Sequence, residues 1–340
     1  MAKKFDQSNM RQVILDFPKQ FKVGVEAAKN IKTSANRSLF SNIIICGMGG
    51  SALPGDVFVM INNHLLLTKL PVFIHQNYGL HPMTNKNSFV VCISYSGNTE
   101  ETISAFKEAR KKKLSIAAIA SGGKLIELAK KNNVPFAQIA AGNQPRCALG
   151  YQFSALIKIL SNFKLIKNLD KELFALEKNL APHKLEKTGL SLAKKLKGKI
   201  PLVYSSEDNK CLARIWKIKF NENSKIPSFY NSLPELNHNE MTGMGDCEIK
   251  EWRELFQVIF LSDKTDHPRI IKRMNILSEI FQKRNIKTNF VQIEGKNIID
   301  KIFNNNLIAD WTSYYLAVSR NIDPTPVKLV EEFKKKMADE

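Results

Sequence analysis

The alternation of short apolar runs with amphipathic stretches is the feature that most restricts how this chain can fold. Apolar runs of strand length occur in the first half at residues 42–46, 71–75, 89–93, 115–120 and 135–139. Stretches with helical spacing lie between several of them, at 52–65, 100–112 and 124–132. Strands that alternate with helices in this way form parallel sheets with helices on their faces. The pattern therefore predicts a doubly wound α/β fold.

The same alternation returns in the second half, after a long helical segment. From about residue 151 to 197 the chain is rich in leucine and lysine, with helical spacing and few turn residues. Strands are expected at 201–205, 228–232, 256–261 and 287–293, and helices at 210–221, 268–283, 297–320 and from 327 onward. A length of 340 residues suits two domains. We expect these domains at 1–150 and 199–322, with a helical connection at 151–198 and a tail helix at 323–340.

The composition excludes some classes of protein. No apolar run reaches the roughly 18–20 residues that span a bilayer, and the start lacks the apolar stretch of a secretory signal, so we expect a cytoplasmic protein with no membrane partner. The 5 cysteines are scattered without a C-x-x-C spacing, which favours reduced and mostly buried thiols. The 6 histidines have no metal-ligand spacing, so we expect no zinc site.

The chain is strongly basic, with 51 Lys and Arg against 32 Asp and Glu and a net charge of +19. Such a field attracts anions. The lysines are distributed rather than gathered in one arm, and no helix-turn-helix, zinc-finger or RNP-type motif accompanies them, so we expect no nucleic-acid partner. Solvated lysine-rich faces and the steering of a small phosphorylated substrate remain as interpretations of the charge.

A small polar loop from Ser94 to Thr99 joins the strand at 89–93 to the helix that follows. The first N–H groups of a helix lack partners and carry roughly half a positive charge, which attracts a phosphate dianion. Ser94, Ser96 and Thr99 add three hydroxyls that can donate to phosphate oxygens, and Gly97 permits a tight turn. The loop therefore predicts a phosphate site.

The alternative for this loop is an ordinary capped turn. Asn98 or Thr99 would then be the N-cap of the helix, with Glu101 reaching back to it. The carboxylates of Glu100 and Glu101 would also repel a phosphate that they faced. Three hydroxyls within six residues nevertheless exceed what one cap needs, and phosphate binding remains the favoured interpretation.

A glycine-rich turn from Cys46 to Ala52 follows the first strand and formally fits the dinucleotide pattern G-x-G-x-x-A. That fold also needs an acidic residue at the end of the next strand to hold the ribose, and His75-Gln76-Asn77 stands there instead. We therefore expect no nicotinamide cofactor. The simpler interpretation is that Gly49, Gly50 and Ser51 let a sugar lie close to the backbone.

These two loops resemble the sugar isomerase (SIS) domain family and, with further motifs, the bifunctional phosphoglucose/phosphomannose isomerases within it. The further motifs are Gln144-Pro145-Arg146 before Leu149-Gly150-Tyr151, Asn221-Glu222-Asn223, His238 and the tail Asp323-Pro324-Thr325-Pro326. The resemblance covers nearly the whole chain. It implies two SIS-type domains, of which the first carries the phosphate loop, and a homodimer.

The resemblance implies an aldose–ketose isomerase that needs neither metal nor cofactor. Such an enzyme interconverts glucose 6-phosphate, and mannose 6-phosphate as well, with fructose 6-phosphate through a cis-enediolate. The reaction moves a proton between C1 and C2 of the sugar. It needs a base that carries the proton both ways, a cation for the developing oxyanion and an acid that opens the sugar ring.

The resemblance also gives individual residues their roles. Glu222 is the shuttling base, although a lone glutamate at a helix end is by itself most often a surface residue. The guanidinium of Arg146 stabilises the enediolate, a task that suits a group that is always charged. His238 opens the ring and reaches the site near or across the dimer interface. Without the resemblance, a loop histidine is more often structural, and Glu235 and Glu240 are rival acids or bases.

A lysine of the terminal helix assists ring opening in related enzymes. Lys328, Lys334, Lys335 and Lys336 all qualify by type, and Lys334 is favoured by its distance from the Asp323-Pro324 tail. A threonine lets mannose 6-phosphate react in this family, and Thr325 is a candidate for that position.

Two other functions fit the same residues. A sugar-phosphate sensor would bind without turnover, and an isomerase of another phosphorylated sugar would share the whole catalytic set. In the second half, the segment Tyr204-Ser205-Ser206-Glu207-Asp208 stands where a duplicated phosphate loop is expected, and it lacks the Ser-Gly-Asn-Thr sequence. We therefore expect one phosphate site per chain.

Overall fold

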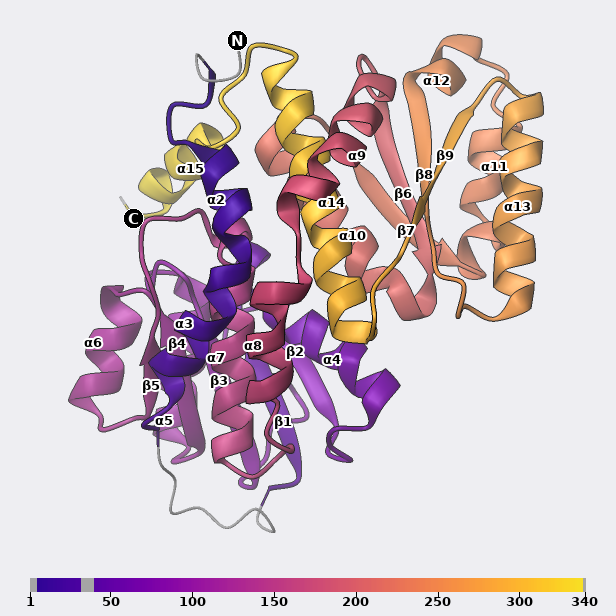
Figure 1. Ribbon diagram of the computed structural model, residues 1–340. Coiled ribbons are helices and arrows are strands. Elements are labelled where there is room, and N and C mark those ends of the chain that lie inside the picture. Colours follow the sequence, from indigo (N-terminus) through magenta and orange to yellow (C-terminus); the bar gives the residue numbers. More distant parts are fainter. Residues whose placement is uncertain (1–4, 32–39, 339–340) are drawn as a thin grey trace. The chain divides into compact units, whose positions relative to one another are not determined.

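Figure 1 shows the computed structural model of the chain, which describes residues 5–31 and 40–338. The chain divides into two compact units. The N-terminal unit comprises Asp16–Ala181 and Gly295–Ile302, and the C-terminal unit comprises Met1–Leu15, Pro182–Glu294 and Phe303–Glu340. Each unit holds one parallel sheet with helices. The α/β fold with two parallel-sheet domains that the sequence predicts is thus confirmed.

The sheet of the N-terminal unit has the order β2-β1-β3-β4-β5, and all neighbouring strands are parallel. Its strands are β1 (Asn42–Cys46), β2 (Val72–His75), β3 (Ser88–Ile93), β4 (Ser115–Ala120) and β5 (Phe136–Gln138). β1 and β3 are buried along their whole length, so they are near-continuous apolar runs. Because the strands are parallel, the glycine turn after β1 and the polar loop after β3 begin at the same edge of the sheet.

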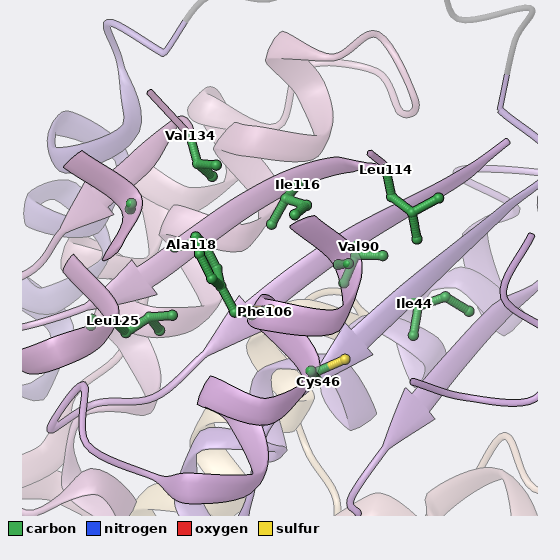
Figure 2. Close-up of a cluster of buried hydrophobic side chains, with 14 of the residues drawn as sticks. Ile44, Cys46, Val90, Phe106, Leu114, Ile116, Ala118, Leu125 and Val134 are labelled. Carbon is green, nitrogen blue, oxygen red and sulfur yellow. The ribbon is translucent and has the colours of Figure 1, made fainter. Parts of the chain in front are cut away.

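Helices cover this sheet. They are α3 (Gln20–Ala28), α4 (Leu53–Leu65), α5 (Glu100–Lys111), α6 (Gly123–Lys131), α7 (Leu149–Asn162) and α8 (Asp170–Asn179), with short helical turns η1 (Phe17–Lys19), η3 (Gly49–Ser51) and η4 (Pro145–Cys147). Figure 2 shows the core where α5 and α6 pack on the strands, with Phe106 and Leu125 beside Val90 and Ala118. α7 packs against both α3 and α4.

The sheet of the C-terminal unit has the order β7-β6-β8-β9 and is also parallel throughout. Its strands are β6 (Ile200–Ser206), β7 (Phe229–Leu233), β8 (Phe256–Ser262) and β9 (Lys287–Gln292). Tyr204, Val258 and Phe260 of the strands form its core with Leu277 and Phe281 of α13 (Pro268–Lys283).

Seven further helices and three short turns lie in the described part of the chain. They are α2 (Met10–Asp16), α9 (Pro182–Lys195), α10 (Lys210–Lys219), α11 (Glu240–Gly245), α12 (Lys250–Leu255), α14 (Ile298–Val318) and α15 (Lys328–Ala338). The short turns are η5 (Glu207–Asn209), η7 (Glu235–His238) and the π-helical turn η6 (Phe220–Ser224), which continues α10. Of the helices in the described part of the chain, none is long and apolar enough to cross a membrane.

Most elements lie where the sequence pattern predicts them. β1, β4 and α13 have the expected bounds, and α7, α8 and α9 fill most of the segment expected to be helical. The sequence pattern does not predict α2, α3, α11 or α12, and it predicts one regular helix from residue 210 to residue 221. The structure ends the α-helix at Lys219 and widens it into η6, which contains the Asn221-Glu222-Asn223 motif.

Candidate active site

The polar loop after β3 is held in a tight turn by its own residues. Gly97 has φ +75°, and a Cβ atom there would lie 1.8 Å from the carbonyl oxygen of Gly122, so no other residue fits. The buried hydroxyl of Ser94 accepts a hydrogen bond from the Gly97 N–H at 3.1 Å and lies 2.8 Å from the hydroxyl of Thr99. The hydroxyls of Ser94 and Thr99 are therefore placed together at the end of β3.

The start of α5 has no side-chain cap. Thr99 is the N-cap residue, but its side chain accepts no hydrogen bond from the helix. Asn98 does not cap α5 either, because its side-chain oxygen accepts from the Lys124 N–H at 3.0 Å. The capped-turn alternative is therefore not the structure that forms. The positive end of α5 remains available to an anion.

The two glutamates that open α5 lie near Tyr78, in the segment after β2. The carboxylate of Glu100 accepts a hydrogen bond from the Tyr78 hydroxyl at 3.0 Å. This bond is the main cause of the raised pKa of Tyr78, and the charge of Glu101 adds to it. The Glu100 carboxylate is therefore engaged outside the Ser94–Thr99 loop.

The glycine turn contacts both the polar loop and the residues around Arg146. The Ser51 hydroxyl accepts from the Tyr95 N–H at 2.9 Å, which joins η3 to the polar loop. A Cβ atom on Gly50 would lie 2.6 Å from the backbone nitrogen of Arg146, so the two backbones touch there. Gly49 has φ +50° and nothing within 4 Å of the position of a Cβ atom, so the turn is open on that side.

Arg146 lies in η4 and is fully buried. Its guanidinium lies 3.5 Å from the side-chain oxygen of Gln144. Tyr95 fixes the neighbouring segment, since its hydroxyl donates to the Ala140 carbonyl at 3.0 Å and accepts from the Asn143 N–H at 2.9 Å. Six expected binding residues and Arg146 therefore belong to one group of contacting turns in the N-terminal unit.

Glu222 lies in the π-helical turn η6 of the C-terminal unit and is half-buried. Its backbone carbonyl accepts from the Lys225 ammonium at 2.5 Å, and the same ammonium donates to the Pro324 carbonyl at 3.0 Å. Lys219 forms an ion pair with Asp310 at 2.6 Å, in which both side chains are buried. The lysines on either side of Glu222 are therefore engaged with a carboxylate and with backbone carbonyls.

His238 is exposed at the end of η7. The nearby Glu240 carboxylate accepts from the Tyr204 hydroxyl and from the Asn231 amide, each at 2.5 Å. Burial raises the pKa of Tyr204 well above its usual value, and Glu240 raises it further. Glu240 thus ties the start of α11 to β6 and β7, whereas Glu235 accepts from the Asn239 side chain at 2.8 Å.

Lys334 lies in α15, where every residue from 328 to 337 is exposed. Lys328, Lys335 and Lys336 lie in the same helix, and Lys336 forms an exposed ion pair with Glu332 at 3.3 Å. The choice of Lys334 among these lysines stays a prediction.

Comparison with known proteins matches both halves of the chain. The SIS domain model covers residues 41–140, and the model of the bacterial phospho-glucose isomerase C-terminal SIS domain covers residues 185–337. A bifunctional phosphoglucose/phosphomannose isomerase from Caldicellulosiruptor bescii is 34% identical over 97% of this chain and 99% of that protein. One of the same name from Thermoplasma acidophilum is 36% identical over 88% of this chain and 90% of that protein.

The chain belongs to the family of bifunctional phosphoglucose/phosphomannose isomerases. The fold is shared more widely. The C-terminal domain of glucosamine-fructose-6-phosphate aminotransferase from Francisella tularensis superposes with a TM-score of 0.69 at 14% identity, over 94% of this chain and 98% of that one. Similarity at that level shows the fold alone.

The strand order of the two sheets shows that the counterpart of the Ser94–Thr99 loop in the C-terminal unit is not the segment predicted from the sequence. In the N-terminal unit the Ser94–Thr99 loop follows β3, which lies beside β1 on the side away from β2. The equivalent strand of the other sheet is β8, so the counterpart lies at 262–267 and not after β6. Both segments carry carboxylates. Asp266 accepts from the Ser206 hydroxyl at 2.6 Å, and Asp263 and Asp266 are both buried. These charges oppose a second phosphate.

The residues expected to act on substrate are divided between the two units. Arg146, the glycine turn and the Ser94–Thr99 loop lie together in the N-terminal unit. Glu222, His238 and Lys334 lie on three different elements of the C-terminal unit, η6, η7 and α15. The sequence does not predict that Tyr95 joins the polar loop to the segment before Arg146, nor that a buried residue of α14 binds η6, because neither arrangement has a sequence motif. Within residues 5–31 and 40–338, no group of three or more His, Cys, Asp or Glu side chains is arranged to hold a metal ion.

Proposed function

We propose that the chain isomerises glucose 6-phosphate and mannose 6-phosphate to and from fructose 6-phosphate, without a metal or another cofactor. The similarity along nearly the whole chain to curated bifunctional isomerases carries this proposal. The 5 cysteines of the sequence are all free thiols, which supports a reducing cytoplasmic location.

Phosphate binding is assigned to the loop from Ser94 to Thr99. The hydroxyls of Ser94, Ser96 and Thr99 donate to phosphate oxygens, and the uncapped start of α5 supplies N–H groups and a partial positive charge. The sugar then lies along the glycine turn, where Gly49 leaves open space. This arrangement anchors the substrate at the end remote from C1 and C2.

Proton transfer is assigned to Glu222. Its carboxylate removes a proton from C2 of the open-chain aldose and returns it to C1, and the reverse reaction uses the same group. The electron pair of the broken C–H bond forms the enediolate, whose negative oxygen is stabilised by the guanidinium of Arg146. Mannose 6-phosphate requires the intermediate to present its other face at C2, and Thr325 is the residue we assign to that tolerance.

Ring opening precedes proton transfer and is assigned to His238, assisted by Lys334. A histidine suits this role because an imidazole can both donate and accept a proton. We propose that the chain forms a homodimer and that His238 serves the site near or across the subunit interface. The exposure of His238 at the end of η7 supports this assignment.

The test offers fructose 6-phosphate to the purified protein in the presence of a chelator and separates the products. The proposal expects both glucose 6-phosphate and mannose 6-phosphate. Glucose 6-phosphate alone would contradict the dual activity, and activity that is lost with the chelator and restored by a metal would contradict metal independence. Binding without any product would leave the sensor as the function.

A further inference from the structure

We infer that Ser313, on α14, is a positioning residue for the base Glu222. This inference rests on the proposed function, because it takes Glu222 to be the group that moves the proton. Ser313 acts through the two residues that follow Glu222 in η6, Asn223 and Ser224.

Ser313 binds η6 through both its side chain and its backbone. Its hydroxyl accepts from the Asn223 amide at 2.9 Å, and its carbonyl accepts from the Ser224 hydroxyl at 2.9 Å. The Ser313 hydroxyl in turn donates to the Ala309 carbonyl at 2.8 Å. Ser313, Asn223 and Ser224 are all fully buried. One serine of α14 therefore joins two successive residues of the π-helical turn.

Helix α10, which η6 continues, is joined to α14 by further buried polar contacts. The indole N–H of Trp216 donates to the Asn305 side chain at 2.7 Å. Lys219 pairs with Asp310 at 2.6 Å. These contacts hold α10 on α14 but lie before the π-helical turn, whereas those of Ser313 lie within it. Ser313 is therefore the α14 residue whose contacts bear most directly on the shape of the turn at Glu222.

A π-helical turn needs such support because it is the less stable form of a helix. It contains one more residue per turn than an α-helix, so its relaxation to regular α-helix would rotate flanking side chains by about 100°. Glu222 lies in the middle of the turn, from Phe220 to Ser224. Loss of the Ser313 hydroxyl removes a buried acceptor of the Asn223 amide and so weakens the hold of α14 on the turn. The carboxylate of Glu222 would then be displaced from C1 and C2.

The test compares Ser313→Ala with Thr312→Ala. Thr312 is also fully buried on α14, and its hydroxyl donates to the Ile308 carbonyl of the same helix at 2.7 Å. Both variants remove a buried hydroxyl from α14, but only Ser313→Ala removes an acceptor for η6. We expect Ser313→Ala to lower kcat by about 10- to 100-fold, as expected for a displaced catalytic group, with KM changed less than about twofold. Thr312→Ala should keep kcat near normal, and both variants should be assayed well below their melting temperatures.

Three results would overturn either the positioning role of Ser313 or the role of Glu222 as the base. Equal kcat values for Ser313→Ala and Thr312→Ala, with Glu222→Gln inactive, would overturn the positioning role and leave the proposed function standing. Near-normal turnover by Glu222→Gln would instead overturn the base. If Ser313→Ala does not fold, Ser224→Ala removes the second bond to Ser313, and an unchanged kcat in that variant would likewise overturn the inference.

Discussion

Thr99 and Thr102 stand one helical turn apart at the start of α5, yet their hydroxyls have different surroundings. The Thr99 hydroxyl lies 2.8 Å from that of Ser94 in the proposed phosphate site. The Thr102 hydroxyl is buried, and no hydrogen-bond partner is present for it among the described residues. Variants at these two threonines therefore distinguish a loss of phosphate binding from the general effect of removing a threonine hydroxyl.

We expect Thr99→Val to raise KM for fructose 6-phosphate by about 10-fold or more, because a hydrogen bond to a charged group is worth about 1.5–3 kcal/mol. Thr102→Val, which keeps the shape and removes an unbonded hydroxyl, should leave KM unchanged. Steady-state kinetics of the two variants checks this. The same KM for both would show that Thr99 does not bind the phosphate.

Single residues could be predicted from the sequence where their chemistry is local. The hydroxyls of Ser94 and Thr99 and the turn at Gly97 belong to one short segment between a strand and a helix, so their proximity follows from the pattern. The contact between Gly50 and the Arg146 backbone could not be predicted, because nearly 100 residues separate them and only the sheet order brings the two turns together. The role of Tyr95 depends on other long-range contacts, with Ser51, Ala140 and Asn143.

At the scale of elements, strands and helices follow from periodicity, but the π-helical turn does not. A run of apolar residues with helical spacing predicts α10, and the same spacing continues through Asn221. The turn is hydrogen-bonded to a buried residue of α14, Ser313, and that partner is distant in the sequence. The predicted position of the second loop, after β6, is wrong for a similar reason. The order of strands in the sheet, and not their order along the chain, makes β8 the equivalent of β3.

The ion pair between Lys219 and Asp310 makes a stability prediction for these two helices. The side chains are 1% and 4% exposed and 2.6 Å apart. Asp310→Ala should lower the free energy of unfolding by about 3–5 kcal/mol, because it removes the carboxylate that pairs with a buried ammonium. The double variant Lys219→Met/Asp310→Leu should recover much of that loss. Urea unfolding measures both, and a loss below about 1 kcal/mol for Asp310→Ala would contradict a buried pair.

At the scale of the whole molecule, the chain's first described residues belong to the same unit as its C-terminal half. Arg11 of α2 forms a salt bridge with Glu186 of α9 at 2.8 Å, and the Tyr315 hydroxyl donates to the same carboxylate at 2.5 Å. Burial alone would raise the pKa of Glu186, but the bonds from Arg11 and Tyr315 lower it below its usual value. Burial and Glu186 raise the pKa of Tyr315 to about 12.

This lowered pKa predicts how stability depends on pH. A carboxylate whose pKa is lower in the folded state stabilises the fold above its unfolded pKa, and the gain is lost as the pH falls through the folded pKa. Glu186→Gln should therefore lower the free energy of unfolding by about 0.5–1 kcal/mol at pH 7, and this loss should shrink as the pH falls through the lowered pKa of Glu186. Glu26→Gln, which removes an exposed pair with Lys29, is the control with little effect across the same pH range. A loss for Glu186→Gln that does not shrink as the solution is acidified would contradict the assignment.

The proposed dimer makes a prediction about mixed subunits. If His238 of one chain serves the site that contains Glu222 of the other, then a mixed dimer of Glu222→Gln and His238→Ala chains has one intact site. Unfolding and refolding an equal mixture of the two inactive variants should restore about a quarter of normal activity, since half the dimers are mixed. No restored activity, although mixed dimers form, would place both residues in a site of one chain.

Proton exchange at the sugar tests the central claim most directly, that Glu222 carries a proton between C1 and C2. Fructose 6-phosphate is incubated with the protein in D₂O and chelator, and deuterium is followed by NMR. The account predicts that the parent protein places solvent deuterium at C1 of the ketose and at C2 of both aldose phosphates. Glu222→Gln should bind fructose 6-phosphate but exchange neither position. Exchange by Glu222→Gln at near the parent rate would show that another group is the base.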